Sequence, residues 1–268
     1  TNFTSGNCLM LAATWHSNRN NGQATPVVFL HGLLGSQEDW QGVLALLQNF
    51  PQFRPLTIDL PFHGKSKKIA CQDFADLRTQ LHQTLTTLLS DTPFFLVGYS
   101  LGGRVALDYT FHAQNPHLLG TILEGTNIGL KTEAECQDRW QNDQCWANRF
   151  RTEPITQVLN DWYQQPIFAH LDAYKRSILI EKRQHNSGKN IAQMLESTSL
   201  AKQQDYADLL KMREKNITFF IGEKDQKFRQ LAEENQLPHR FINNAGHNSH
   251  AENAEGFVQR MVEAIANI

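Results

Sequence analysis

Short continuous apolar runs alternate along the chain with longer segments in which apolar residues recur every three or four positions. The short runs predict strands that are buried on both faces of a sheet, and the longer segments predict amphipathic helices. Strands that alternate with helices over short links are typical of a mainly parallel, doubly wound α/β sheet. The expected strands are 27–30, 55–58, 94–97, 121–123, 217–221 and 240–242, and the expected helices are 39–50, 73–89, 101–112, 227–235 and 251–267.

The alternation is interrupted once, between residues 127 and 204. This stretch has no strand pattern, is polar and helical in pattern, and is punctuated at Pro154 and Pro166. A structureless loop of that length does not suit a compact domain, and open α/β sheets bind ligands at the carboxyl ends of their strands. We therefore expect a helical insertion over that end of the sheet, the cap segment (127–204), and a core formed by 1–126 and 205–268.

Composition and charge narrow the classes of partner. The 268 residues carry 25 Lys and Arg against 27 Asp and Glu, a balance that argues against a nucleic-acid partner but leaves room for a local basic pocket. No apolar run approaches the ~20 residues of a membrane-spanning helix, so we expect no membrane insertion. The first residues lack the pattern of a secretory leader, and the cysteines (Cys8, Cys71, Cys136, Cys145) are dispersed like reduced thiols. We expect a cytoplasmic protein that is a monomer or a small homo-oligomer.

The segment Gly98-Tyr99-Ser100-Leu101-Gly102 has the pattern G-x-S-x-G. It follows an apolar strand and opens an amphipathic helix, which is the context of a nucleophile elbow. In such a turn the serine hydroxyl is exposed above the sheet, and the glycines are needed because a side chain would clash there. The pattern therefore predicts Ser100 as the reactive residue.

A serine hydroxyl is too weakly acidic to react alone, so it needs a base, and the base needs an orienting acid. On this fold the acid and then the histidine follow the serine along the chain. Asp225 and His247 each come after a predicted strand and fit these two roles. Glu223 competes with Asp225 but lies nearer the strand end. His250 competes with His247, but we expect it outside the turn, facing solvent or the cap.

Two backbone N–H groups are expected to form an oxyanion hole, which stabilises negative charge on a substrate oxygen. One belongs to Leu101, directly after the serine, and the other to Leu33, in the turn after strand 27–30. We expect His31 to brace this turn rather than to catalyse. The sequence has no zinc, dinucleotide-binding or P-loop motif, so we expect no metal and no cofactor.

Arginines and aromatic residues form a second group of candidates. Arg104 lies one helical turn after Ser100, which is a position that can face the mouth of the site. Its planar guanidinium suits the binding of carboxylates. Taken alone, Arg104 and the arginines of the cap segment are better explained as solvated helix surface. Trp162 and Tyr163 are likewise better explained as the core of the cap.

The motifs together resemble those of the MenH family, the 2-succinyl-6-hydroxy-2,4-cyclohexadiene-1-carboxylate (SHCHC) synthases of menaquinone biosynthesis, which have the α/β-hydrolase fold. The elbow is shared by the whole hydrolase superfamily, whereas the segments in the cap and after the acid are much more specific. The matching segments are 29–33, 39–40, 97–106, 152–154, 161–166, 222–229 and 245–250.

The resemblance implies that a Ser100, Asp225 and His247 triad serves an elimination rather than a hydrolysis. A proton leaves the ring of a cyclohexene that bears an enolpyruvyl group, pyruvate departs, and no cofactor takes part. The resemblance also favours a small polyanionic metabolite as partner, since the substrate carries several carboxylates. The carboxylate-binding arginines of the family align with Arg104, Arg139 and Arg183, and its other substrate contacts align with Tyr99 and Trp162.

Two other classes of function stay open. A serine hydrolase of esters, thioesters or carbon–carbon bonds would use the same triad and form an acyl-serine. A non-catalytic binding protein on this fold is disfavoured by the intact triad. One departure from the family pattern is Phe62, which stands where related enzymes usually have Gly and bears on the conformation of a loop near the site.

Overall fold

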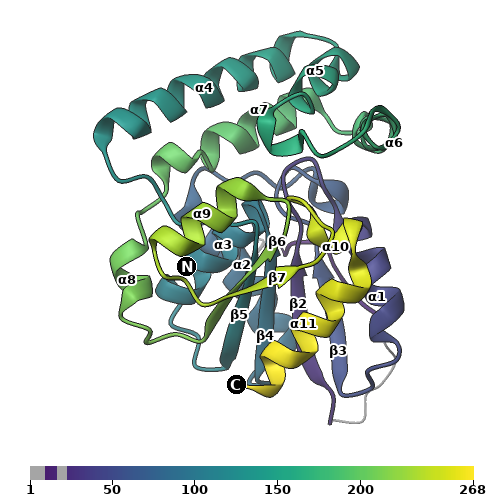
Figure 1. Cartoon of the computed structure of the whole chain (residues 1–268), viewed down its shortest axis with the longest axis vertical. Coiled ribbons are helices and arrows are strands. Elements are labelled where there is room, and N and C mark those ends of the chain that lie inside the picture. Colours follow the sequence, from purple (N-terminus) through teal and green to yellow (C-terminus); the bar gives the residue numbers. More distant parts are fainter. Residues whose placement is uncertain (1–9, 17–22) are drawn as a thin grey trace, which may run out of the picture.

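The computed structural model describes residues 10–16 and 23–268, so the expectation about a leader and the fourth cysteine, Cys8, lie outside the described part. The described strands form one seven-stranded sheet in the order β1-β3-β2-β4-β5-β6-β7 (Figure 1). All pairs are parallel except β1 with β3. The strands are β1 (Ala13–Trp15), β2 (Thr25–Leu30), β3 (Phe53–Ile58), β4 (Phe94–Tyr99), β5 (Leu118–Glu124), β6 (Ile217–Gly222) and β7 (His239–Ile242).

The α/β architecture and the six predicted strands are confirmed, as β2 to β7. Strand β1 was not predicted, because it is short and half-exposed and therefore lacks a continuous apolar run. Burial explains the continuous apolar runs of the predicted strands. For example, the residues from Pro26 to Leu30 in β2 and all six residues of β4 are buried. Each fully buried Val, Leu or Phe side chain contributes roughly 1.5–3 kcal/mol to stability.

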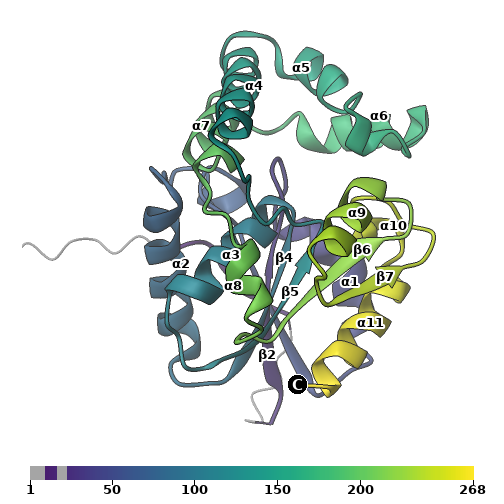
Figure 2. The ribbon, with the colours of Figure 1, turned by 60° about the vertical axis from the view of Figure 1, so that its left-hand side comes forward.

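Helices cover both faces of the sheet (Figure 2). One face packs against α2 (Phe74–Leu89), α3 (Leu101–His112) and α8 (Ala207–Lys211). The opposite face packs against α1 (Gln41–Leu47) and α11 (Ala254–Ala266). Two further helices, α9 (Gln226–Glu234) and α10 (Ser249–Glu252), lie after β6 and β7.

The prediction of a single helix over 251–267 is wrong, because the helix is interrupted at Asn253, which separates α10 from α11. The backbone of Asn253 leaves the helical region (φ −145°, ψ 77°), and its side chain caps α11 by accepting a hydrogen bond from the Gly256 N–H. Asparagine is among the preferred residues at a helix N-terminus for this reason.

The cap segment folds into helices with an apolar cluster of their own (Figure 1). A capping box of Thr132 and Glu135 starts α4, and Pro154 separates α4 from α5. The cluster includes Phe150, Leu159 and Ile191 and also reaches Leu34 of the core. The helices are α4 (Glu133–Thr152), α5 (Ile155–Trp162), α6 (Ala173–Arg183) and α7 (Gly188–Ser197), with the 3₁₀ helices η3 (Pro166–Phe168) and η4 (Leu200–Lys202).

The two connections between the cap segment and the core run side by side. The Tyr206 N–H donates to the Ile128 carbonyl at 2.8 Å, and Nε2 of Gln203 donates to the Asn127 carbonyl at 3.1 Å. Gly129 has a φ of +122°, and a Cβ there would overlap Asp205. The helical segment is therefore joined to the sheet through a narrow neck.

Two properties bear on the expectations drawn from composition. Within the described ranges, no helix is both long enough and apolar enough to cross a membrane. Cys71, Cys136 and Cys145 form no disulfide with one another in the described part of the chain.

Candidate active site

Ser100 lies at the sharp turn between β4 and α3. Its backbone has φ 51° and ψ −110°, a left-handed conformation that costs of order 1–3 kcal/mol for a residue with a side chain. The two glycines of the motif make the turn possible, because a Cβ on Gly98 would overlap the Gly102 carbonyl and one on Gly102 would overlap the His31 carbonyl. The Ser100 N–H donates to the Glu124 carbonyl at the end of β5, at 2.8 Å. The hydroxyl is thereby held above the centre of the sheet.

The structure brings Asp225 and His247 to this hydroxyl. Nε2 of His247 lies 3.4 Å from Oγ of Ser100, and Nδ1 lies 2.9 Å from Oδ2 of Asp225. Both side chains are buried, and the Phe228 ring stacks on the imidazole. A carboxylate on Nδ1 keeps the proton there, so Nε2 is free to accept one from the serine. The competing Glu223 lies on the outside, where it accepts a hydrogen bond from the Asn244 N–H.

The expectation that His250 faces solvent or the cap is wrong. His250 is 2% exposed, its ring stacks on Trp40, and its Nδ1 lies 2.7 Å from Oε2 of Glu124. Glu124, which is fully buried, also accepts hydrogen bonds from the His250 N–H and from Oγ of Ser249. A buried carboxylate requires such partners, and the donors come from the loop that carries His247. The pair therefore fixes the histidine loop to the end of β5.

The turn after β2 places the other predicted oxyanion donor. Leu33 and Leu101 both line the cavity that contains Ser100, and no hydrogen bond among the described residues occupies either of their N–H groups. The Gly35 N–H donates to the Gly32 carbonyl at 3.0 Å and closes the turn around Leu33. In the parallel pair of β2 and β4, Leu30 lies beside Gly98, which puts this turn next to the elbow. The two N–H groups are thus available to a substrate oxygen.

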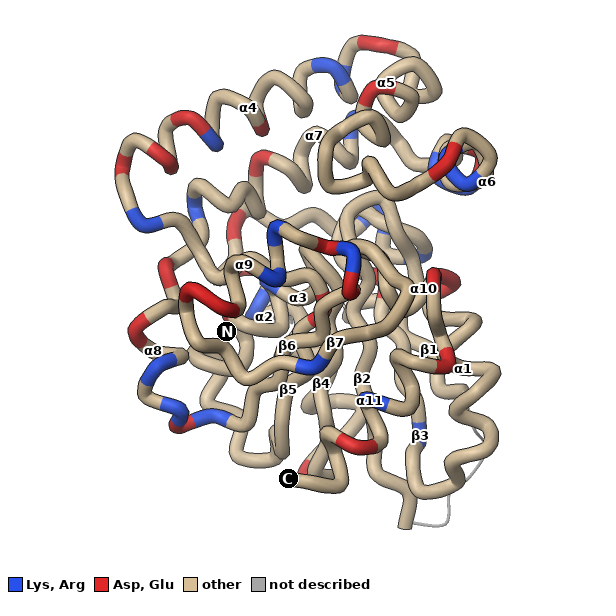
Figure 3. Tube along the Cα trace, in the orientation of Figure 1, with Lys and Arg blue, Asp and Glu red and all other residues tan. Residues whose placement is uncertain are grey.

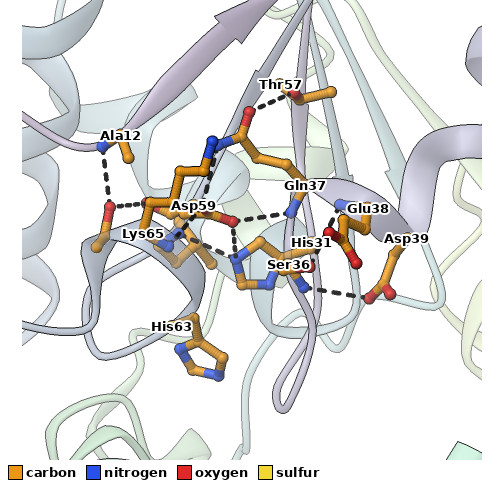
Figure 4. A network of polar contacts seen from close by, with 12 residues as sticks. Ala12, His31, Ser36, Gln37, Glu38, Asp39, Thr57, Asp59, His63 and Lys65 are labelled. Atoms are coloured by element: carbon orange, nitrogen blue, oxygen red, sulfur yellow. Dashed lines mark hydrogen bonds and ion pairs between the residues drawn. The ribbon is translucent and has the colours of Figure 1, made fainter. Parts of the chain in front are cut away.

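Two buried histidines, His31 and His63, support this turn, and both are drawn in Figure 4. Nε2 of His31 accepts from the Leu60 N–H and Nε2 of His63 accepts from the Leu34 N–H, both at 3.0 Å. The Nδ1 atoms donate to the Gly32 and Pro61 carbonyls, so both rings are neutral. Burial lowers the pKa of His31, and it lowers that of His63 to about 3. His31 therefore has the bracing role that the sequence suggested.

Asp59 ties the same region together (Figure 4). Its carboxylate accepts hydrogen bonds from the Gln37 N–H, from Nε2 of Gln37 and from the Lys65 N–H. Phe62, in the loop between Asp59 and Lys65, has a φ of +66°. This left-handed backbone explains physically why glycine suits that position.

Two chambers meet at Ser100 and His247. The first, which we call the polar chamber, has a volume of about 370 Å³ and includes Arg104, Arg139 and Lys227 in its lining. The second, the apolar chamber, has about 380 Å³, and its lining includes Tyr99, Tyr163, Leu171, Ile178 and Leu179. Leu33, Ser100, Trp162, Phe168 and His247 line both.

The structure groups only two of the three predicted arginines. Arg104 and Arg139 lie in the polar chamber, whereas Arg183 lines the apolar one. The Arg104 guanidinium donates to the Thr198 carbonyl at 2.7 Å, and burial lowers its pKa to about 9, so it stays charged at neutral pH. Nε of Arg139 donates to Asp143, which leaves the rest of its fork for a ligand.

Arg183 has a carboxylate partner already. Its two terminal nitrogens donate to the two oxygens of Asp39 at 2.7 and 2.8 Å, and both side chains are buried. Burial opposes ionisation of Asp39, but the charge and hydrogen bonds of Arg183 hold the pKa of its carboxyl well below the usual range. Asn186 adds a hydrogen bond to the Leu34 carbonyl at 3.0 Å. These contacts attach the end of α6 to the turn that carries Leu33.

Of the two aromatic candidates, Tyr99 lines the apolar chamber and Trp162 lines both chambers. Tyr99 is buried against His247 and His250, and burial raises the pKa of its hydroxyl well above the usual value. Trp162 packs edge-on against Trp146 and Phe150 in the cap, and it also lines both chambers. Trp162 is therefore both part of the cap core and exposed to a ligand.

Three residues of this site were missed as functional candidates: Lys227, Glu124 and Asp39. Lys227 had a signal, since it follows Asp225 by two positions, and Glu124 ends a predicted strand. Asp39 had no signal of its own beyond its place in segment 39–40, which matches the family. Over the described residues, no group of three or more His, Cys, Asp or Glu side chains is placed to hold a metal ion.

Comparison with known proteins agrees with this architecture. Residues 25–254 match the family model of the alpha/beta hydrolase fold. The chain is 41% identical over 255 residues to the 2-succinyl-6-hydroxy-2,4-cyclohexadiene-1-carboxylate synthase of Yersinia pseudotuberculosis, covering 95% of this chain and 92% of that protein. It is 47% identical over 244 residues to a Haemophilus influenzae protein provisionally given the same name, covering 90% and 98%. The solved structure of MenH from S. aureus superposes with a TM-score of 0.84 at 26% identity, covering 95% of this chain and 98% of that one.

The sheet, the elbow and the serine–histidine–aspartate arrangement define a member of the alpha/beta hydrolase fold family. Within that class, the chain belongs to the family of the 2-succinyl-6-hydroxy-2,4-cyclohexadiene-1-carboxylate synthases.

Proposed function

We propose that this protein is a lyase that eliminates pyruvate from 2-succinyl-5-enolpyruvyl-6-hydroxy-3-cyclohexene-1-carboxylate and so forms SHCHC for menaquinone biosynthesis. The observation that carries the proposal is the identity of 41% over 95% of the chain to a named synthase. The contacts of His247 with Ser100 and Asp225 supply the base that the reaction needs.

The bond changes follow from the structures of substrate and product. The substrate loses the proton of ring carbon 2, which is acidified by the neighbouring succinyl ketone. A double bond forms between carbons 2 and 3, the existing one moves to carbons 4 and 5, and the bond from carbon 5 to the enolpyruvyl oxygen breaks. The released enolpyruvate takes up a proton and becomes pyruvate, so the reaction needs no oxidant and no acyl-enzyme.

The residues of the site have matching roles in this proposal. Ser100, deprotonated by His247, takes the ring proton, and Asp225 stabilises the imidazolium that results. As the proton leaves, negative charge develops on the ketone oxygen, which the N–H groups of Leu33 and Leu101 stabilise. Arg104 and Arg139 bind carboxylates of the substrate, and Tyr99 and Trp162 contact its body. Arg183 is the weakest of the proposed substrate contacts, because Asp39 occupies its fork.

The test is release of pyruvate from the enolpyruvyl substrate by the purified protein. We expect Ser100→Ala to lower kcat by about 10³-fold or more, since it removes the group that takes the proton. Absence of pyruvate release by the unchanged protein would contradict the proposal. A burst of product with a covalent acyl-serine would instead favour the serine hydrolase alternative.

We also infer the kind of partner, the oligomeric state and the cellular location from the net charge and the cysteines. A small polyanionic metabolite is the expected partner rather than a nucleic acid, because the formal net charge is −2. We expect a monomer or small homo-oligomer in the cytoplasm, where free thiols such as Cys71 stay reduced.

A further inference from the structure

The polar chamber carries more positive charge than its own acidic group neutralises. Arg104, Arg139 and Lys227 line it, and the one carboxylate in that lining belongs to Asp143. This carboxylate is already used, because it accepts hydrogen bonds from Arg139 and, at 2.7 Å, from Oγ of Ser199. An anionic ligand would therefore complete the charge balance of the chamber.

Neither Arg104 nor Lys227 has a carboxylate partner in the described part of the chain, but Arg104 donates to the Thr198 carbonyl, whereas the Lys227 ammonium has no hydrogen bond there. The contact recorded for its ammonium is with the face of the Phe228 ring, 5.7 Å from the centroid. Burial lowers the pKa of Lys227, and the charge of Arg139 lowers it further, whereas Asp225 opposes both effects. The side chain nevertheless keeps solvent-exposed surface, so its ammonium can reach a ligand carboxylate in the chamber and form a charge-assisted hydrogen bond.

We propose that Lys227 is a substrate-binding residue that holds a carboxylate in the polar chamber, beside the groups bound by Arg104 and Arg139. The inference rests on the proposed function for the identity of the ligand, whose succinyl, enolpyruvyl and ring positions each bear a carboxylate. Lys227 stands two residues after Asp225, at the start of α9. The residue that binds the substrate and the acid that orients His247 are therefore parts of one short segment.

Lys227→Met and Lys227→Arg test the proposal, with Lys224→Met as the matched control. Lys224 is exposed, belongs to the same segment and lies outside the lining of both chambers, so its replacement changes the net charge equally. In the pyruvate-release assay we expect Lys227→Met to raise KM about tenfold or more, as for a lost charge-assisted contact. Lys227→Arg keeps the charge and should stay within about threefold, and Lys224→Met should not change KM.

Product inhibition identifies which carboxylate is held. Weaker inhibition of Lys227→Met by SHCHC would assign a carboxylate that stays on the ring product, and weaker inhibition by pyruvate would assign the departing one. A KM of Lys227→Met equal to that of Lys224→Met would overturn the proposal. A lower kcat at unchanged KM would also overturn it, because Lys227 would then act through Asp225.

A binding experiment separates this inference from the proposed function. Calorimetry with SHCHC, which carries two carboxylates, needs no turnover. Weaker binding of SHCHC, or of pyruvate in a parallel titration, to Lys227→Met than to Lys224→Met supports the role of Lys227 even if the unchanged protein releases no pyruvate. Equal binding of both compounds contradicts it. Circular dichroism of each variant establishes that it is folded.

Discussion

At the scale of single residues, the site depends on backbone conformation and on buried side chains as well as on the reactive groups. Ser100 is held at φ 51° between two glycines that have no room for a side chain. The motif G-x-S-x-G predicts this conformation because few other turns require glycine at both positions. The buried position of His250 had no comparable local signal, since it depends on Glu124, which is 126 residues away in sequence.

Gly102→Ala should strongly destabilise the folded protein. The new methyl group would overlap the carbonyls of Leu30 and His31, which are backbone atoms at the end of β2 and directly after it and cannot easily move aside. We expect a loss of at least about 3 kcal/mol in the free energy of unfolding, measured by urea denaturation. Gly42→Ala is the control, because Gly42 lies within helix α1 and its new Cβ would be at an ordinary 3.5 Å from the Cβ of Ala254. The unfolding free energy of this variant should stay within about 1 kcal/mol of that of the original protein.

At the scale of elements, the site is assembled from loops that follow different strands and from helices of the cap. The strands were predictable because their apolar runs are continuous, and the order of serine, acid and histidine then identified Ser100, Asp225 and His247. The break at Asn253 and the short α8 were not predictable from periodicity, because both are decided by capping and packing. The partition of the arginines between two chambers also depends on the tertiary fold, which brings Arg183 to Asp39 across 144 positions.

Arg183 and Asp39 should behave as a coupled pair in a double-mutant cycle. Arg183→Met and Asp39→Asn each leave a buried charged or polar group without its partner, so we expect each to cost about 3–5 kcal/mol in unfolding free energy. The double variant should be less destabilised than the sum of the two. Additive losses would show that the two side chains do not act together. A rise in KM confined to Arg183→Met would instead indicate direct binding of substrate.

At the scale of the whole molecule, the charges are dispersed rather than gathered on one face. Figure 3 shows Lys and Arg intermingled with Asp and Glu along both the core and the cap helices. The near-zero sum therefore conceals a local excess of positive charge in the polar chamber. Composition favoured a small ligand over a polymer but had no information on where the arginines lie.

Stability of the whole fold should decrease in mild acid because of the buried histidines. In the unfolded chain a histidine takes up a proton near pH 6.5, whereas burial holds the pKa of His63 near 3 in the folded protein. Between these values the unfolded chain binds more protons. The contribution of His63 is thus complete above about pH 6.5 and is lost by about 1.4 kcal/mol per pH unit as the pH falls toward 3.

Urea denaturation at pH 7.5 and pH 5 measures this loss. His63→Gln, which has no titrating group, should show a smaller decrease in unfolding free energy over the same interval. The exposed His185→Gln should keep the original decrease. An identical pH dependence in all three proteins would contradict the assignment to His63.

The narrow neck at Ile128 and Tyr206 has a consequence for how such enzymes diverge. The chain enters and leaves the inserted helices at this one place, and the strand register on either side, between β5 and β6, does not pass through them. Mutations in α4 to α7 can therefore reshape the walls around the serine without disturbing the strand pairing, as long as the contacts of Arg183 with Asp39 and of Asn186 with Leu34 are kept. Natural selection can thus alter the cap helices while the strands that carry the reactive serine are inherited unchanged.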